Sequence, residues 1–211
     1  MFSNNDRNIK KCLELIPEHS LAVDFKKKFP QSHRKKAVFL DRDGIINFKM
    51  PEGDYVKNCN EFKIIPGAIE AICELKSAGY YIFIVTNQRG IALGLINQET
   101  LNAIHQQLIN ILSKKGSSVD GIFICPHDYA DNCECRKPKP GLILRAASLY
   151  GFEDLNDSYM IGDSFSDIEA GKAVGCKCIY VNQNDICLKA DYSCGSLMEA
   201  KNYILHNVFQ R

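Results

Sequence analysis

The sequence has no excess of charge of either sign, since 26 Lys+Arg stand against 25 Asp+Glu and give its 211 residues a formal charge of +1. That balance argues against a dedicated nucleic-acid-binding domain, which is usually strongly basic. Long apolar runs are also missing, because no window approaches the ~18 residues of a membrane span. The first residues lack the apolar core of a signal peptide, so we expect a cytoplasmic protein.

Cysteines are too few for a secreted disulfide scaffold, although ten in 211 residues is above average. Such scaffolds carry about 8–10% cysteine. In a reducing compartment thiols are buried, bound to a metal or reactive. Cys125, Cys133 and Cys135 crowd into one short segment, and this cluster needs its own explanation.

The length fits one globular domain with a short appendage. We place the domain at residues 37–211 and an N-terminal extension, partly helical or mobile, at residues 1–36. The extension ends in a basic stretch, and we favour a solvated segment over a docking arm for a partner. We expect a monomer, and a dimer stays open.

From residue 37 onward, short apolar runs alternate with helical periodicity. This alternation predicts an α/β fold of the Rossmann-like kind, with a parallel sheet and helices on both faces. The predicted strands cover residues 37–41, 80–85, 122–124, 159–161 and 178–181. The predicted helices begin near residues 68, 97, 142 and 166.

Polar side chains follow the predicted strands at the edge where open α/β sheets bind ligands. Asp41 and Asp43 follow the first strand, Thr86 the second and Asp163 the fourth, while Lys137 precedes the helix near residue 142. Carboxylates so close together suppress each other's ionisation unless a cation is present. Because Mg²⁺ prefers carboxylate oxygens, waters and phosphate as ligands, the pocket predicts a magnesium site.

The same residues suit phosphoryl chemistry. An aspartate can act as a nucleophile that forms an aspartyl-phosphate. A second aspartate two residues along an extended segment faces the same side and can serve as general acid and base. Thr86 and Lys137 offer a hydroxyl donor and a positive charge to phosphoryl oxygens.

Four motifs resemble those of the haloacid dehalogenase superfamily of phosphohydrolases, in the same order and spacing over residues 37–183. They are Phe-Leu-Asp-Arg-Asp-Gly at 39–44, Thr-Asn at 86–87, Arg-Lys-Pro at 136–138 and Gly-Asp-Ser-Phe-Ser-Asp at 162–167. The resemblance implies Asp41 as nucleophile and Asp43 as acid/base. It also implies Mg²⁺ bound by Asp41, Asp163 and the backbone carbonyl of Asp43. The remaining motif residues would stabilise the phosphoryl group or support the site: Thr86, Lys137 and Asp167.

The cysteine cluster forms a C-x-H, five-residue gap, C-x-C pattern made of Cys125, His127, Cys133 and Cys135. Three thiolates and one imidazole suit a tetrahedral Zn²⁺ ion, and four protein ligands leave no open position for catalysis. We therefore predict a structural zinc that clips this loop. Because Arg136 and Lys137 come next, the clip would fix the residues that hold phosphate.

A zinc clip before Arg-Lys-Pro resembles the branch of the superfamily that holds the heptose 1,7-bisphosphate phosphatases and the histidinol-phosphate phosphatases. Residues 41–47, 53–56, 86–94 and 137–141 are more similar to the heptose enzymes. This resemblance implies removal of the C7 phosphate of D-glycero-D-manno-heptose 1,7-bisphosphate, in ADP- or GDP-heptose biosynthesis. The expected contacts to this sugar phosphate are Asp54, Tyr55, Asn87, Gln88, Arg89, Arg136 and Ser164.

Cap insertions have little room between these motifs, so we expect a capless enzyme. Its specificity would come from residues 48–58, residues 88–94 and the zinc loop. Three alternatives stay open. The short gap between the zinc pairs is similar to that of the histidinol-phosphate phosphatases of histidine biosynthesis. A general sugar-phosphate phosphatase and a non-enzymatic, zinc-clipped partner-binding module are the others.

Overall fold

The computed structural model describes residues 35–209 of the chain, so the predicted extension lies outside the described residues except for its last two. The described residues form one six-stranded sheet in the order β3-β2-β1-β4-β5-β6, and every neighbouring pair is parallel. The strands are β1 (Ala37–Leu40), β2 (Tyr81–Asn87), β3 (Gly121–Cys125), β4 (Tyr159–Gly162), β5 (Lys177–Val181) and β6 (Tyr192–Cys194).

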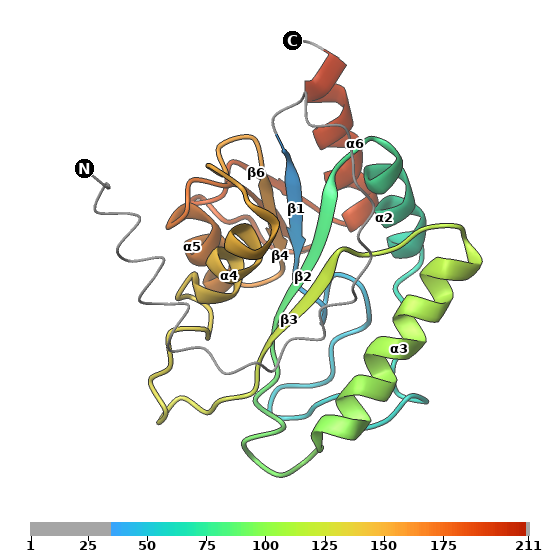
Figure 1. Cartoon of the computed structure of the whole chain (residues 1–211), viewed down its shortest axis with the longest axis vertical. Helices are drawn as coiled ribbons and strands as arrows, with labels where there is room; N and C mark the ends of the chain where they lie inside the picture. The colour runs from blue at the N-terminus through green and yellow to red at the C-terminus, as the bar shows by residue number, and fades with distance from the viewer. Residues whose placement is uncertain (1–34, 210–211) are drawn as a thin grey trace.

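Helices cover both faces of this sheet (Figure 1). One layer contains α2 (Ala68–Ser77), α3 (Gln98–Lys114) and α6 (Leu197–Phe209), and the other contains α4 (Gly141–Tyr150) and α5 (Phe165–Lys172). Side chains of a strand alternate between the two faces. Val38 and Leu40 accordingly join one apolar cluster, and Ala37 and Phe39 join the other. The predicted α/β sandwich is confirmed.

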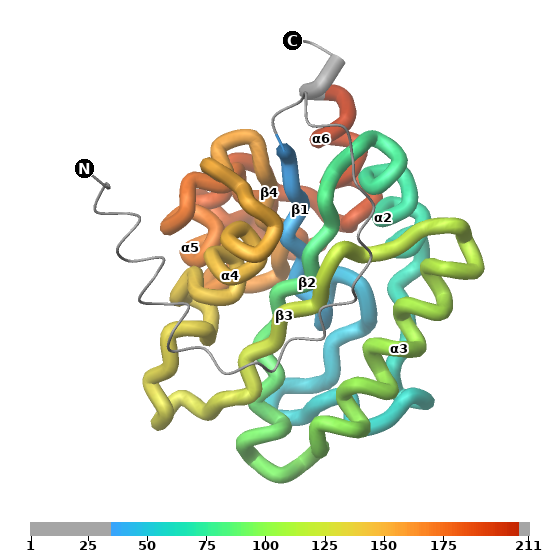
Figure 2. The backbone as a smooth tube through the Cα atoms, viewed as in Figure 1, coloured from blue at the N-terminus to red at the C-terminus, as the bar shows by residue number. Residues whose placement is uncertain are grey.

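The strand order places β1 beside β4 at the centre, where connections leave in opposite directions along the sheet. Such a switch point opens a crevice outside the carboxyl ends of the strands. The backbone N–H of Asp41, just past β1, donates to the carbonyl of Ile161 in β4 at 3.0 Å. Two long connections, residues 41–67 and 126–140, lie at the same end of the molecule as these strand ends (Figure 2). The fold therefore surrounds the predicted site with loops.

Five of the six strands were predicted from the sequence, whereas β6 and α6 were not. Strand β6 is three residues long, Tyr-Ser-Cys, and therefore shows no apolar run. Strand β2 also continues past its apolar run, because Thr86 and Asn87 pair with Ile124 and Cys125 of β3. This pairing fixes both motif residues on a regular strand instead of a loop.

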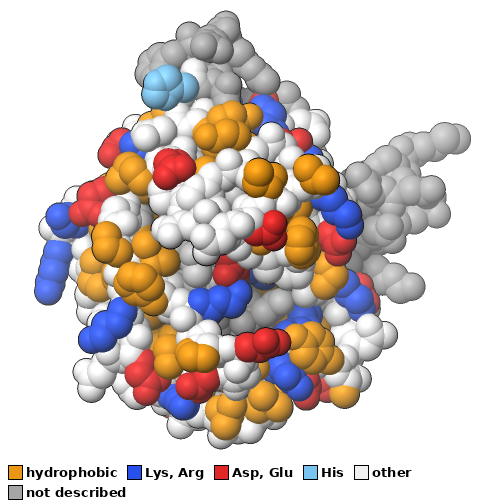
Figure 3. Space-filling view, turned by 180° about the vertical axis from the view of Figure 1, so that it is seen from behind, with side chains coloured by type: hydrophobic (Ala, Val, Ile, Leu, Met, Phe, Trp, Pro, Cys, Tyr) orange, Lys and Arg blue, Asp and Glu red, His pale blue; other side chains and the backbone are white. Residues whose placement is uncertain are grey.

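The surface is mixed in character. On the face drawn in Figure 3, lysine and arginine side chains are interspersed with acidic and hydrophobic ones. None of the helices in residues 35–209 has the length and hydrophobicity needed to cross a bilayer.

Candidate active site

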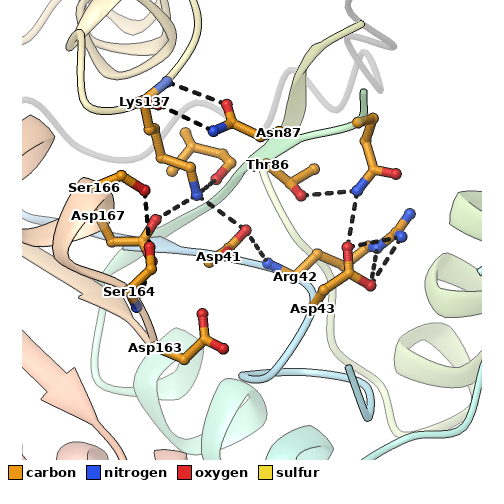
Figure 4. A network of polar contacts seen from close by, with 12 residues as sticks. Asp41, Arg42, Asp43, Thr86, Asn87, Lys137, Asp163, Ser164, Ser166 and Asp167 are labelled. Carbon is orange, nitrogen blue, oxygen red and sulfur yellow. Dashed lines mark hydrogen bonds and ion pairs between the residues drawn. The ribbon is translucent and has the colours of Figure 1, made fainter. Parts of the chain in front are cut away.

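Three aspartates meet at the carboxyl ends of the two central strands (Figure 4). Asp41 follows β1, Asp163 follows β4, and Asp167 lies in the first turn of α5. One carboxylate oxygen from each lies within 4.8 Å of the others. Asp167 also closes a capping box with Ser164, whose backbone N–H and hydroxyl donate to Asp167 Oδ2 at 3.1 and 2.6 Å. The three aspartates that the sequence assigns to the site therefore lie together in the fold.

Lys137 joins these carboxylates through a fully buried ammonium group. Its Nζ atom lies 3.0 Å from Asp41 Oδ1 and 2.5 Å from Asp167 Oδ1, and it donates to the carbonyl of Val85 at 2.8 Å. Burial alone would lower the pKa of Lys137, but the charges of Asp167 and Asp41 raise it. Lys137 is thus a permanent cation beside the predicted nucleophile.

Asn87 fixes the backbone that carries this lysine. Its side-chain oxygen accepts from the Lys137 N–H at 3.1 Å, and its amide donates to the Lys137 carbonyl at 3.2 Å. The following peptide bond, Lys137–Pro138, is cis. Asn87 therefore has a positioning contact in addition to its place in the cavity wall.

The carboxylates have the character of a divalent-cation site. Burial raises the pKa of Asp41 to about 7, while Lys137 acts in the opposite sense. Asp163 Oδ1 is buried and has no hydrogen-bond partner among the described residues. A Cβ atom on Gly44, whose φ is +88°, would lie 2.3 Å from Asp163 Oδ2, so only glycine lets the backbone approach this closely. These three carboxylates offer more oxygen donors than Lys137 alone can satisfy, and a cluster of such donors suits Mg²⁺.

Asp43 points away from this group, toward Arg42 (Figure 4). The prediction that residues 41–43 are extended is wrong, because the chain turns here. The N–H groups of Ile46 and Asn47 donate to the Arg42 carbonyl. The Asp43 carboxylate accepts from Arg42, Asn47 and Gln88 at 2.8–3.3 Å. Burial raises the pKa of Asp43, but Arg42 and the other donors outweigh it and lower the pKa.

These groups surround a cavity of about 620 Å³. Its wall includes most of the residues that the sequence analysis assigned to catalysis, magnesium or substrate: Asp41, Asp43, Asp54, Tyr55, Thr86, Asn87, Arg136, Lys137, Asp163 and Ser164. Two assigned substrate contacts lie outside this wall. Gln88 is buried behind it, donating to Thr86 Oγ1 at 2.9 Å, and Arg89 pairs with Asp128 at 2.5 Å.

Lys49 and Tyr129 are among the cavity-wall residues that were not predicted as individual contacts. Lys49 extends from the 48–58 loop and places its Nζ atom 2.7 Å from Asp163 Oδ2. Tyr129, in the zinc loop, is exposed, and its ring lies 4.1 Å from the guanidinium carbon of Arg136. Both loops were predicted to determine specificity. Only the fold shows which of their side chains face the cavity.

The predicted zinc ligands converge on one point at the carboxyl end of β3. Cys125 Sγ lies 3.5 Å from Cys133 Sγ and 3.6 Å from His127 Nδ1. Cys135 Sγ lies 3.4 Å from Cys133 Sγ and 3.2 Å from His127 Nδ1. A tetrahedral zinc with ordinary bond lengths would separate its ligand atoms by about 3.5–3.8 Å. Hydrogen bonding from Cys135 and His127 lowers the pKa of Cys125 to about 5, while the same contact with Cys125 raises the pKa of Cys135, so the cluster holds at least one thiolate before any metal binds.

We expect Cys133→Ser to remove the zinc and lower the melting temperature by several degrees, because a hydroxyl is a poor replacement for a thiolate ligand. Metal analysis and a thermal melt of the purified protein measure both effects. Cys59→Ser, at an exposed free thiol, is the matched control and should change neither. Unchanged zinc content and melting in Cys133→Ser would contradict the zinc assignment.

The chain is similar to known phosphohydrolases. A family model described as haloacid dehalogenase-like hydrolase matches residues 16–175. The D-glycero-beta-D-manno-heptose-1,7-bisphosphate 7-phosphatase of Pseudomonas aeruginosa is 41% identical over 147 residues, covering 70% of this chain and 81% of that protein. The D-glycero-alpha-D-manno-heptose-1,7-bisphosphate 7-phosphatase of Mycobacterium tuberculosis is 38% identical over 167 residues, covering 77% and 87%.

A solved structure is similar over nearly its whole length. It is the D,D-heptose 1,7-bisphosphate phosphatase from B. bronchiseptica, complexed with magnesium and phosphate. The TM-score is 0.73 at 33% identity, and the match covers 82% of this chain and 99% of that one.

The chain therefore belongs to the haloacid dehalogenase-like hydrolases, and within them it is a phosphatase. It is closely related to the D-glycero-D-manno-heptose-1,7-bisphosphate 7-phosphatases. The non-enzymatic alternative is accordingly set aside.

Proposed function

We propose that this protein is a Mg²⁺-dependent phosphatase that removes the C7 phosphate of D-glycero-D-manno-heptose 1,7-bisphosphate. The observation that carries the proposal is the buried Asp41–Lys137 pair, beside which Asp163 has a carboxylate oxygen without a hydrogen-bond partner among the described residues. The fold that holds these groups is similar to that of a solved heptose bisphosphate phosphatase. The product, a heptose 1-phosphate, would serve ADP- or GDP-heptose biosynthesis.

The reaction begins with attack by an Asp41 carboxylate oxygen on the phosphorus. A bond forms between this oxygen and phosphorus while the bond from phosphorus to the sugar oxygen breaks, and Asp43 gives that oxygen its proton. The entering phosphate dianion favours the protonated form of Asp43, against the donors that lower its pKa. In the second step Asp43 takes a proton from water, and the hydroxide attacks phosphorus to release phosphate and free Asp41.

Cations and hydrogen-bond donors stabilise the phosphoryl oxygens during both steps. Lys137 Nζ is already fixed beside Asp41, and the Thr86 hydroxyl lies in the wall of the cavity. Asp41, Asp163 and the backbone carbonyl of Asp43 would hold Mg²⁺, which supplies Lewis-acid charge stabilisation when bound. Removing a comparable donor from an active site typically costs about 10²–10³ in rate.

The rest of the substrate would contact the loops around the cavity. Arg136 has a buried Nε atom without a hydrogen-bond partner among the described residues. Its guanidinium is held by Tyr129 and by the His127 carbonyl, which accepts from Nη1 at 3.3 Å. The zinc loop thus presents a preorganised cation to the sugar phosphate. Asp54, Tyr55 and Ser164 would contact the hydroxyl groups from the opposite loops.

We place this activity in the cytoplasm and assign it to a monomer. None of the nine described cysteines forms a disulfide, and three of them are the proposed zinc ligands, a usage typical of proteins in a reducing compartment. The monomer is proposed because the candidate catalytic residues Asp41, Asp43, Lys137 and Asp163 line one cavity within a single chain.

Turnover in the presence of Mg²⁺ tests the proposal. We expect kcat/KM for the heptose 1,7-bisphosphate to exceed that for histidinol phosphate by at least about 100-fold, since a missing contact to a buried polar group costs several kcal/mol. Faster hydrolysis of histidinol phosphate would overturn the substrate and favour the histidine-biosynthesis alternative.

We also expect Mg²⁺ to raise the melting temperature more at about pH 8 than at about pH 5. Burial raises the pKa of Asp41 in the folded protein to about 7, above its ordinary value near 3.9. Without metal, the folded state is therefore destabilised relative to the unfolded state as the pH rises between those two values. A cation favours the ionised form, and its binding strengthens over the same range. Melting curves with and without about 10 mM MgCl₂ measure the difference. Asp163→Asn should abolish it, and equal shifts at both pH values would contradict the carboxylate site.

A further inference from the structure

The guanidinium of Arg42 is buried directly against the Asp43 carboxylate, with 1% of its side chain exposed. Its Nη2 atom lies 2.9 and 3.0 Å from the two carboxylate oxygens, and its Nε atom lies 3.3 Å from Oδ1. The Phe62 ring covers one face, with its centroid 5.9 Å from the guanidinium carbon. Arginine keeps its charge even when buried, so Nε and Nη2 form a permanent charged contact with the Asp43 carboxylate.

His105 completes the shell around Arg42 from helix α3, 63 positions along the chain. The ring is buried, and its Nε2 atom lies 3.2 Å from Arg42 Nη1. A guanidinium has no acceptor, so the imidazole must accept at Nε2 and carry its proton on Nδ1. Burial lowers the pKa of His105 to about 3, with the charge of Arg42 acting in the same direction, and this keeps the ring neutral.

This chain of contacts runs from helix α3 to the catalytic cavity. Asp43 is its only partly exposed member, at 24%, and it lines the cavity. Asn47 and Gln88 add single hydrogen bonds to the carboxylate, at 2.8 and 2.9 Å. Neither of them restrains the guanidinium itself, whose Nη1 edge is bound by His105.

We infer that His105 and Arg42 are positioning residues for the acid/base group. His105 fixes the Nη1 edge of the guanidinium, and the opposite edge then holds Asp43 where it can protonate the departing ester oxygen. The inference rests on the proposed function, which makes Asp43 the general acid.

Leaving-group dependence separates this role from a structural one. An alkyl oxygen is strongly basic and needs a proton as it departs, whereas 4-nitrophenolate leaves without one. A misplaced acid therefore impairs hydrolysis of alkyl phosphates and spares 4-nitrophenyl phosphate. The ratio of the two kcat/KM values is the readout, because kcat/KM reports the steps up to departure of the leaving group.

The decisive comparison is His105→Gln against His105→Asn. The amide oxygen of glutamine can replace Nε2 as acceptor, while asparagine is one methylene shorter and leaves Arg42 Nη1 unpaired. We expect His105→Asn to lower kcat/KM for the heptose bisphosphate roughly 30-fold and for 4-nitrophenyl phosphate less than about 3-fold, as general acid catalysis contributes about 10²–10⁴. His105→Gln should stay within about 3-fold of wild type on both substrates.

Leu108→Ala, at a buried position one turn along α3, is the control for destabilisation alone and should change both substrates by the same factor. Equal losses on the two substrates in His105→Asn would overturn the inference, as would no loss at all. If the wild type does not hydrolyse the heptose bisphosphate, the proposed substrate is wrong. Glycerol 2-phosphate then serves as the alkyl ester, and its ratio to 4-nitrophenyl phosphate still tests His105.

Discussion

Asp41→Asn is expected to reduce phosphatase turnover at least about 10³-fold while the protein stays folded. An amide oxygen cannot attack phosphorus as the carboxylate does, so no aspartyl-phosphate forms. The replacement has the same shape, and it removes a carboxyl group whose pKa is raised by burial to about 7. The melting temperature at neutral pH should therefore stay the same or rise. Steady-state kinetics with Mg²⁺ and a thermal melt measure both.

Asp185→Asn is the matched control, because this aspartate is exposed on the loop after β5, away from the catalytic cavity. It should leave turnover unchanged. Retention of more than about a percent of wild-type turnover in Asp41→Asn would contradict the assignment of Asp41 as nucleophile.

Lys137→Met is expected to impair both turnover and stability. The ammonium group lies between Asp41 and Asp167, and the variant would leave two buried carboxylates without their cation. Breaking a buried pair in this way typically costs about 3–5 kcal/mol. For a domain of this size we expect the melting temperature to fall by roughly 6–20 °C. Loss of positive charge beside the phosphoryl group should lower kcat/KM by a further factor of about 10²–10³.

Calorimetry and kinetics on the same preparation measure the two losses. Lys189→Met is the control, since Lys189 is 69% exposed in its surface pair with Glu169 and should affect neither quantity. A Lys137→Met variant with wild-type melting temperature and turnover would contradict the role assigned to Lys137 in the site.

The convergence of the candidate reactive groups could be predicted because their positions follow simple rules of topology. Asp41 and Asp163 follow apolar runs, and parallel strands bring their carboxyl ends to one edge. The zinc ligands were predicted from spacing alone, and the structure brings the four side chains together. In both cases residues near in sequence, or at equivalent strand ends, must be near in space.

The orientation of Asp43 could not be obtained in this way. A period of two places it on the side of Asp41, but Gly44 has a φ of +88° and the chain turns toward Asn47. The turn brings the Asp43 carboxylate into contact with the Arg42 guanidinium, which also contacts His105 on helix α3. Contacts between segments so far apart depend on how a helix packs, which hydrophobic periodicity does not specify.

The sequence predicts which loops contact the substrate, but only the fold shows which individual side chains of those loops face the cavity. Gln88 was predicted as a substrate contact because it follows Thr86 and Asn87. Its amide instead donates to Thr86 and Asp43 behind the cavity wall. Lys49, within a predicted specificity loop, reaches Asp163 at 2.7 Å. Side-chain direction in an irregular loop depends on its local turns, and composition does not reveal them.

The proposed reaction is Mg²⁺-dependent hydrolysis at C7 of the heptose bisphosphate. A ³¹P NMR time course with wild-type protein, Mg²⁺ and D-glycero-D-manno-heptose 1,7-bisphosphate tests it most directly. We predict that the C7 phosphate resonance disappears, inorganic phosphate appears in equal amount and the C1 phosphate resonance persists. Loss of the C1 resonance, or a spectrum that stays unchanged, would contradict the account.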